Sequence, residues 1–418
     1  MRNMKDSGVE WLESIPETWN LLQLGSLFSE HKHKNIGMQS SNLLSLSYGN
    51  IIRKNINATD GLLPESFEGY NVIDAGDIVL RLTDLQNDQR SLRVGLCGEN
   101  GIITSAYTTL RRRNDAISSK YFYYLLHSYD VRKGFYGMGA GVRQGLNYAG
   151  VRKIMLAVPS EREQTAIAEC LDQKIAQVDA LITNVQAQIE KLKAYKQSLI
   201  TEVVTKGLDP NVPMKDSGVD WIGTIPENWN VVKTGRLFKE NNRCPIGNDV
   251  PLSLSQADGL VATDDMKESS LKTSSYDNWK RVEIGDLVLN RFKAHLGVLF
   301  AAKLTGIVSF HYGVYEARCR LVPKFYEYLY HSNQYKAILG NASNGMVVGL
   351  QNLSNLSFYT TYSLYPPYAE QEKIADYLDT KCSQIDQLIS LKESKIEKLQ
   401  QYKRSLIYEY VTGKKEVV

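Results

Sequence analysis

The residues of this chain that are best suited to chemistry lie in two polar segments, each directly after a short apolar run. The runs are GDIVL at 76–80 and GDLVL at 285–289, and each is typical of a β-strand that follows a turn. Side chains in these segments carry directional hydrogen-bond donors and acceptors, which suits recognition of a polar ligand. The candidates are Arg81, Thr83, Asp84, Gln86, Asn87, Arg90 and Arg93 after the first run, Asn290, Arg291, Lys293 and His295 after the second, and Arg143 in the loop GVRQG. A polar loop can also be merely solvated, and that alternative stays open for each residue.

Motifs for catalysis or metal binding are not recognisable in the sequence. There is no GxxxxGK[ST] phosphate loop, and the glycine-rich stretch at 134–145 follows an expected helix, not the strand that an S-adenosylmethionine site needs. His31 and His33 have no third ligand nearby, and the five cysteines include no CxxC pair. His127 and His331 stand at equivalent places in YLLHS and YLYHS, where a capping or core role is expected. We therefore expect no catalytic residue and no metal site in this chain.

The chain repeats itself from its midpoint. MKDSGVEWLESIPETWN begins at Met4, and MKDSGVDWIGTIPENWN begins at Met214, with twelve of the seventeen positions identical. Further matches follow in the same order through both halves, including the GDIVL and GDLVL runs and the stretches KYFYYLLHS and KFYEYLYHS. Two copies of this length predict a pseudo-two-fold molecule made from one chain, in which the framework is duplicated and the polar loops have diverged.

Two long stretches show the periodicity of coiled-coil helices. From Glu161 to Thr205 there is no glycine or proline, and apolar residues recur at alternating spacings of three and four. The predicted seam comprises Leu171, Ile175, Val178, Ile182, Val185, Ile189, Leu192 and Leu199 in the first copy, and Leu378, Ile385, Ile389, Ile396, Leu399 and Leu406 in the second. Lys196 and Lys403 interrupt the two seams, and such a residue tends to set the register of pairing. We expect an antiparallel coiled coil, the alternative being that each helix packs on its own domain.

The alternation of mixed strand-and-helix regions with long helical stretches predicts four consecutive segments. They are a domain at 1–158, a spacer helix at 159–213, a domain at 214–365 and a spacer helix at 366–418. Each domain mixes short strands with a short helix, so the expected class is α/β or α+β. Composition is that of an ordinary globular protein, with 43% hydrophobic residues, 23% charged residues and a formal net charge of +3. No stretch of eighteen apolar residues and no signal sequence is seen, so we expect no membrane span and a cytoplasmic location.

The repeated motifs resemble those of a known family. DSGVEWLESIPETWN and DSGVDWIGTIPENWN are similar to the start of each target recognition domain in the specificity subunits of type I restriction–modification systems. PSEREQTAIAECLDQKIAQVDALI and PPYAEQEKIADYLDTKCSQIDQLI resemble the spacer helices of that family. The resemblance covers nearly the whole chain, and the order of domain, helix, domain and helix makes it specific.

The resemblance implies a DNA-binding subunit without catalytic activity of its own. Each target recognition domain would read one half of a split, asymmetric sequence in double-stranded DNA, and the helix pair would set the gap. The implied partners are two methyltransferase subunits and, optionally, restriction subunits. S-adenosylmethionine, ATP and Mg²⁺ would be held by those partners, so no cofactor is expected in this chain.

Under this interpretation the polar candidates named above would contact base edges in the major groove. Tyr48, Asn50, Arg53, Gln144 and Gln256 are second-tier candidates, and Arg111, Arg112 and Arg113 would serve phosphates instead. Position 347 in the second copy is valine where the first has Arg143, so a guanidinium role there is expected in one half only.

Two alternatives stay open. A duplicated coiled-coil adaptor would show no salt-dependent affinity for duplex DNA. A methyltransferase acting alone would bind S-adenosylmethionine as an isolated chain, although the missing glycine-rich loop disfavours it.

Overall fold

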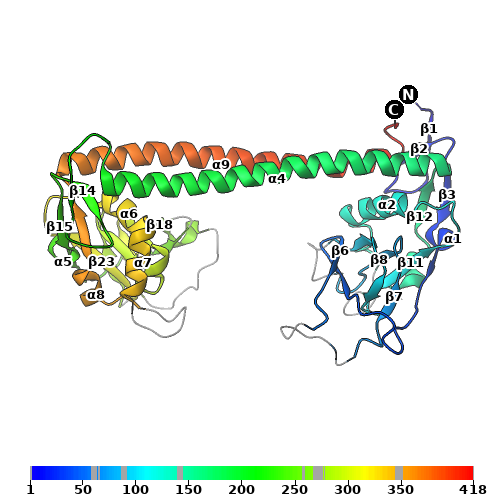
Figure 1. Cartoon of the computed structure of the whole chain (residues 1–418), viewed down its shortest axis with the longest axis horizontal. Coiled ribbons are helices and arrows are strands. Elements are labelled where there is room, and N and C mark those ends of the chain that lie inside the picture. Colours follow the sequence, from blue (N-terminus) through cyan, green and yellow to red (C-terminus); the bar gives the residue numbers. More distant parts are fainter. Residues whose placement is uncertain are drawn as a thin grey trace. The chain divides into compact units, whose positions relative to one another are not determined.

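The computed structural model describes residues 2–57, 64, 66–85, 92–138, 145–256, 259–266, 276, 278–343 and 352–417. The chain forms two compact units (Figure 1). The first unit combines residues 1–185 with 394–418, and the second comprises residues 186–393. The boundary between the units falls inside both long helices, so the units differ from the four consecutive segments that the sequence suggests. Among the described residues, every helix is too short or too polar to span a bilayer.

The sheet domain of the first unit, residues 2–158, is built on a four-stranded antiparallel sheet of order β4-β11-β8-β9. Two-stranded pairs accompany it, namely β1 with β2, β3 with β12, β5 with β6 and β7 with β10. The elements are β1 (Met4–Asp6), β2 (Ser14–Pro16), β3 (Asn20–Gln23), α1 (Leu24–Leu27), β4 (Phe28–Glu30), β5 (Leu44–Ser47), β6 (Asn50–Arg53), β7 (Asn71–Ile73), β8 (Ile78–Leu80), β9 (Val94–Leu96), β10 (Gly101–Ile103), β11 (Thr108–Arg112), α2 (Ser119–Val131), α3 (Tyr148–Val151) and β12 (Met155–Val158). Helix α2 contributes Phe122 and Leu125 to the core that contains Ile78 and Leu80 of β8.

The sheet domain of the second unit, residues 214–365, repeats this plan with the sheet order β16-β23-β20-β21. Its elements are β13 (Met214–Asp216), β14 (Thr224–Pro226), β15 (Asn230–Lys233), α5 (Thr234–Leu237), β16 (Phe238–Glu240), β17 (Leu252–Ser255), β18 (Gly259–Ala262), η1 (Thr263–Asp265), β19 (Lys280–Val282), β20 (Leu287–Asn290), η2 (Arg291–Leu296), β21 (Leu299–Ala301), β22 (Gly306–Val308), β23 (Tyr312–Ala317), α6 (Pro323–His331), α7 (Asn333–Asn341), α8 (Asn355–Thr360) and β24 (Tyr362–Tyr365). The same strand order in both units agrees with the duplication predicted from the sequence, and the GDIVL and GDLVL runs form the equivalent strands β8 and β20.

The two long helices, α4 (Glu161–Lys206) and α9 (Tyr368–Val411), pair antiparallel within each unit. In the first unit Lys403 Nζ lies 2.7 Å from Asp179 Oδ1, and in the second unit Lys196 Nζ lies 2.7 Å from Asp386 Oδ2. Residue numbers rise along α4 as they fall along α9, which fixes the antiparallel direction. The two ion pairs occupy equivalent positions in the repeat, so each lysine on the seam has its own carboxylate on the facing helix.

Burial along the long helices follows the predicted seam. Every described seam residue is buried or half-buried, whereas the exposed large apolar residues of these helices lie off it. Those exposed residues are Leu181, Tyr195, Leu388, Leu391 and Tyr402. The heptad interpretation is therefore confirmed at the level of side-chain burial.

The repeated opening motif packs against the glycine that ends a long helix. Gly413 and Gly207 end α9 and α4 with φ of +71° and +82°, a left-handed conformation that glycine adopts without a steric penalty. A Cβ on Gly413 would lie 2.4 Å from Pro16 Cγ and 3.0 Å from the Trp19 ring. In the second unit a Cβ on Gly207 would lie 3.5 Å from the Trp229 ring. The motif thus packs beside a helix end in each unit.

Each sheet domain is fastened to the start of the helix that follows it by a buried glutamine. Gln164 Oε1 accepts a 2.9 Å hydrogen bond from the backbone N–H of Ser118, the residue that caps α2. Gln371 Oε1 accepts a 2.9 Å bond from the N–H of Val322, before α6. Both glutamines also donate to a proline carbonyl five residues earlier. These residues join the domain to the helix, so the sheet domain and its spacer helix form one body within each unit.

A tyrosine–aspartate pair reinforces the same junction in both units. Tyr124 Oη donates to Asp172 Oδ1 at 2.6 Å, and Tyr328 Oη donates to Asp379 Oδ1 at 2.5 Å. Burial, followed by the hydrogen bond to the carboxylate, raises the pKa of both tyrosines well above its usual range. Both phenols therefore stay protonated and keep their donor role at any ordinary pH.

His331, the last residue of α6, is expected to make the second unit sensitive to acid. His331 is packed against Phe300, and its Nε2 has no hydrogen-bond partner among the described residues. Burial first, and then the nearby positive charges of Lys336 and Lys324, lower the pKa of His331 to about 4. The ordinary value is 6.5. Between these two values the unfolded chain binds the proton and the folded chain does not, so stability falls as pH falls.

We expect the second unit to lose at most about 1.4 kcal/mol of unfolding free energy per pH unit between about pH 6.5 and 4 from His331 alone. The measurement is the unfolding free energy of the second unit by hydrogen exchange across this range, in the wild type and in His331→Phe. The variant removes the titrating group, so the difference between the two curves isolates it from the carboxylates. Parallel curves would show that His331 is protonated in the folded chain as readily as in the unfolded one.

Candidate nucleic-acid interface

In the first unit, the segment after β8 is shaped by Arg93. The guanidinium is fully buried, with Nη1 donating to the carbonyl oxygens of Thr83 at 2.8 Å and Arg81 at 3.2 Å, and Nη2 donating to that of Asp84 at 3.2 Å. The backbone N–H of Arg93 donates to Asp130 Oδ2 at 2.6 Å. This corrects the expectation that Arg93 itself reaches a base edge, because its donors are used to hold the turn. Arg93 acts as a positioning residue.

The other candidates of this segment are distributed over its surface. Thr83 is exposed, whereas Arg81 and Asp84 are half-buried. Asp84 has a φ of +58°, a strained backbone for a residue other than glycine, which the three hydrogen bonds from Arg93 help to maintain. Gln86, Asn87, Arg90, Arg143 and Gln144 lie outside the described residues. Thr83 is therefore the described candidate whose side chain is most open to a ligand.

In the second unit the four candidates take different roles. Asn290 is buried and its side-chain oxygen caps η2 by accepting from the N–H of Phe292 at 3.1 Å. Arg291 is half-buried, and its backbone carbonyl accepts a 3.1 Å hydrogen bond from the N–H of Leu353. His295 is half-buried with an Nδ1 that has no hydrogen-bond partner among the described residues. Lys293 is exposed.

Glu240, at the end of β16, organises this part of the second unit. Its Oε1 lies 2.7 Å from Lys280 Nζ and 2.5 Å from Arg291 Nη2, and its Oε2 accepts from Asn355 Nδ2. Lys280 also donates to the carbonyl of Tyr312 at 3.0 Å. Burial alone would raise the pKa of Glu240, but the hydrogen bond from Lys280 and the charges of Arg291 and Lys280 lower it overall. The expectation that Arg291 reads a base is thereby corrected: it anchors η2.

Strand pairing brings a second segment beside η2. Asn290 of β20 pairs with Tyr312 of β23, so the loop before Tyr312 lies next to the residues after Asn290. The rings of Phe292 and His311 are 5.6 Å apart, and those of Phe310 and His311 are 3.9 Å apart. Nothing in the sequence indicates that these three residues lie together, because neither segment carries a local pattern that points to the other. The signal available was the pairing of the two strands that flank them.

The second-tier candidates lie on the β5–β6 and β17–β18 hairpins. Tyr48 is 73% exposed at the tip of the first hairpin with a φ of +47°, and Asn50 beside it is exposed. Arg53 is exposed but engaged, since its Nε donates to Glu99 Oε1 at 2.8 Å. Gln256 follows β17 directly and is exposed. Tyr48, Asn50 and Gln256 thus keep free access to solvent.

Arg111, Arg112 and Arg113, the arginines expected to serve phosphates, each contact a protein group, and Arg112 and Arg113 remain exposed. Arg111 Nη2 lies 2.7 Å from the buried carboxylate of Asp77. Arg112 pairs with Asp115 at 2.9 Å, and Arg113 Nε donates to the carbonyl of Gly25 at 2.9 Å. The hydrogen bond and charge of Asp77 raise the pKa of Arg111. The expected phosphate role is corrected for Arg111, whose function is to neutralise Asp77.

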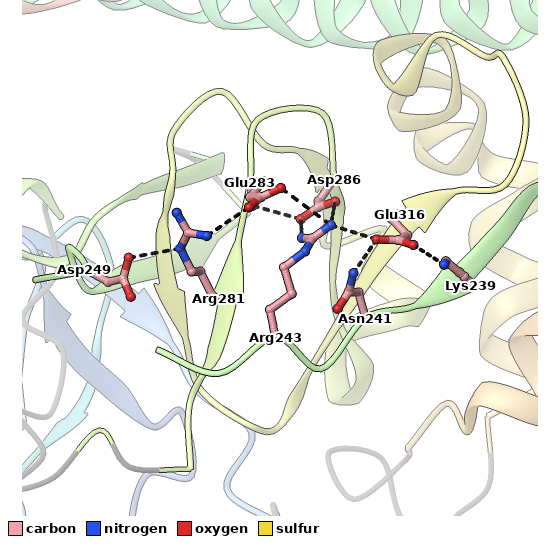
Figure 2. Close-up of polar contacts among 8 residues, drawn as sticks. All are labelled: Lys239, Asn241, Arg243, Asp249, Arg281, Glu283, Asp286 and Glu316. Atoms are coloured by element: carbon pink, nitrogen blue, oxygen red, sulfur yellow. Dashed lines mark hydrogen bonds and ion pairs between the residues drawn. The ribbon is translucent and has the colours of Figure 1, made fainter. Parts of the chain in front are cut away.

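Figure 2 shows how the second unit neutralises the equivalent aspartate by another route. Arg243 Nη1 lies 2.6 Å from Asp286 Oδ2, and its Nη2 lies 2.8 Å from Glu316 Oε2. Glu316 stands where the first unit has Arg111, because each pairs with the middle residue of its edge strand, β16 or β4. Burial raises the pKa of Asp286 despite the bond from Arg243. The framework aspartate is thus kept in both units, while the arginine that pairs with it moved to another segment.

Metal ligands do not gather in the described part of the chain: no group of three or more histidine, cysteine, aspartate or glutamate residues there is placed to hold an ion. The geometry that the two units share is instead one end of the central strands, where the segments after β8 or β20 and before β11 or β23 meet. These segments present polar and aromatic side chains on a rigid support, which suits contacts with a large ligand.

Comparison with known proteins finds relatives that align over nearly the whole chain. No family model matches the chain. It is 23% identical to the type I restriction enzyme MjaVIII specificity subunit of Methanocaldococcus jannaschii, over 96% of this chain and 93% of that protein. It is 24% identical to the putative MjaX specificity subunit of the same organism, over 96% and 94%. Both alignments span nearly the full length of each chain.

Solved structures agree in fold. A chain from a structure describing complex assembly and conformational transition of the type I R-M system has a TM-score of 0.69 at 14% identity, over 95% of this chain and 98% of that one. The HsdS subunit of Thermoanaerobacter tengcongensis has a TM-score of 0.53 at 15% identity, over 96% and 98%. The fold and the full-length similarity agree with the repeated motifs: over nearly its whole length the chain is similar to type I restriction enzyme specificity subunits.

Proposed function

We propose that this chain is the sequence-specific DNA-binding subunit of a type I restriction–modification complex. Each sheet domain reads one half of a bipartite, asymmetric site, and the paired long helices set the number of base pairs between the halves. The main support for the proposal is a contrast between the two units. Their framework is duplicated, but the residues at the equivalent end of the central strands have diverged. A framework kept in two copies with different contact residues suits two different half-sites on one ligand.

Methyltransferase subunits are the partners that we assign to the long helices. Leu181 lies two residues beyond Asp179, and Tyr402 one residue before Lys403, so both lie at the level of that ion pair. Their exposed fractions are 49% and 52%. The second unit repeats this with Leu388 and Tyr195 beside the Asp386–Lys196 pair, at 48% and 56%. An exposed leucine–tyrosine pair once in each unit supports two copies of one partner.

The chemistry of the complex is assigned to those partners. We propose that S-adenosylmethionine is bound by the methyltransferase subunits, and ATP and Mg²⁺ by restriction subunits where these are present. The chain itself then binds the DNA, orients it and places the base to be methylated at a partner subunit.

The test is co-expression of this chain with a type I methyltransferase subunit that binds it, followed by sequencing of host DNA for methylated adenine. We expect a new split motif with a constant gap, which gives both half-sites at once. A complex that forms but adds no methylation would contradict the proposal and favour an adaptor without DNA binding. Salt dependence of duplex affinity in the purified complex provides an independent check.

A further inference from the structure

In the second unit an aromatic cluster is exposed at the end of the central strands, after β20 and before β23. Phe310 is 51% exposed and Phe292 is 37% exposed, and His311 is exposed between them, with ring separations of 3.9 and 5.6 Å. Large rings are normally buried, so a group of three left open to solvent marks a contact surface. We call Phe292, Phe310 and His311 the aromatic cluster.

The cluster is held in place by the interior of the domain. Asn290 caps the N–H of Phe292, and Ser309 accepts hydrogen bonds from Tyr312 and, at 3.5 Å, from His311. Both segments are tied to the one carboxylate of Glu240, through Arg291 on one side and through Lys280 and the Tyr312 carbonyl on the other. Rings positioned in this way lose little further entropy when they meet a ligand.

The cluster belongs to the diverged part of the repeat. Leu80 of β8 pairs with Thr108, as Leu289 of β20 pairs with Gly313. These pairs align the flanking segments of the two units residue by residue. On this alignment, the first unit has small residues at all three places: Thr83 for Phe292, Ser105 for Phe310 and Ala106 for His311. The asymmetry means that any ligand group that the cluster contacts is met by one unit only.

The neighbouring charge points to an apolar group carried on an anion. Lys293 follows Phe292 directly and is exposed, with no acidic partner among the described residues. In the major groove of duplex DNA, the apolar group that varies with sequence is the 5-methyl of thymine, and phenylalanine is one of the side chains that contact it. We propose that the aromatic cluster reads a thymine methyl group in the half-site of the second unit, with Lys293 on an adjacent phosphate. This inference rests on the proposed function.

The experiment uses the complex with its methyltransferase subunits and duplexes that carry the motif found by sequencing. Each thymine of the half-site assigned to the second unit is replaced in turn by deoxyuridine, which removes only the methyl group. At one position we expect methylation of the uracil duplex to fall by about fourfold, the effect of burying one methyl group. Phe310→Ala is expected to lower methylation of the thymine duplex and to remove the difference between thymine and uracil.

Ile284→Ala is the matched control, because Ile284 is 71% exposed at the other end of the same strand region, before β20. It is expected to retain full discrimination, and the half-site of the first unit is expected to be indifferent to Phe310→Ala. Equal methylation of thymine and uracil duplexes by the wild type would overturn the inference while leaving the proposed function intact. A Phe310→Ala chain that keeps the discrimination, or that fails to assemble with the methyltransferase subunit, would also overturn it. A wild-type complex without any motif-dependent methylation would instead refute the proposed function.

Discussion

Glu240→Ala is expected to abolish recognition of one half-site and to leave the other readable. The carboxylate is 13% exposed and forms ion pairs with both Lys280 and Arg291, while it also accepts from Asn355. Removing one partner of a buried charge group leaves the others unpaired, which costs about 3–5 kcal/mol. Both segments that carry the aromatic cluster lose their anchor together. Methylation by the complex should therefore fall below detection at the split motif.

The first unit supplies the control for this variant. Glu30 ends β4 as Glu240 ends β16, but its ion pair is with Lys32, which is 67% exposed. Glu30→Ala is expected to change stability by about 0–1 kcal/mol, the range for a surface pair. Hydrogen exchange should show faster exchange around η2 in Glu240→Ala and unchanged protection in the first unit. Glu240→Gln, which keeps an acceptor oxygen, should recover part of the activity. Normal methylation by Glu240→Ala would show that the network does not position the reading segments.

Trp229→Ala is expected to destabilise the second unit by about 3–5 kcal/mol, the usual range for removing a buried tryptophan. Trp229 is fully buried, and its Nε1 donates to Glu370 Oε2 at 2.6 Å. Its ring lies beside Gly207, which ends α4, since a Cβ there would be 3.5 Å from the ring. The ring centroid lies 6.3 Å from that of Phe325 in α6. The substitution therefore removes a link between the opening motif, a helix end and the core.

The effect of Trp229→Ala is best measured by hydrogen exchange in each unit, because a chain with two compact units need not unfold in one step. Protection should fall in the second unit and at the end of α4. Trp279→Ala is the control, since Trp279 is half-buried in a loop and its loss removes less packing. An unfolding free energy for Trp229→Ala within about 1 kcal/mol of the wild type would mean that the repeated motif contributes little to the fold.

The arginines show where prediction of the site from sequence fails. Arg93 and Arg291 lie near strands β8 and β20 and are of a residue type that contacts bases. Both instead form their hydrogen bonds with groups of their own domain. Their partners, the carbonyls of residues 81–84 and the carboxylate of Glu240, come from other segments. A guanidinium has five donors and binds whatever acceptors the fold brings near, and the sequence around it does not record them.

The sequence by itself determined the duplication, the two central strands and the coiled-coil seam. Each of these follows from local periodicity or from direct repetition of the sequence. Burial of the seam follows the 4–3 spacing because a helix completes one turn every 3.6 residues. Lys196 and Lys403 were identified on the seam, and their carboxylate partners followed once the antiparallel pairing was known.

Tertiary structure alone decided which residues are open to a ligand. Pairing of β20 with β23 places Phe310 and His311 beside Phe292, although eighteen positions separate the two phenylalanines in sequence. The same packing turned Arg111 toward Asp77 in one unit and selected Arg243 for Asp286 in the other. Burial and charge pairing depend on contacts between distant segments, so residue type and local spacing could nominate these side chains but could not assign their roles.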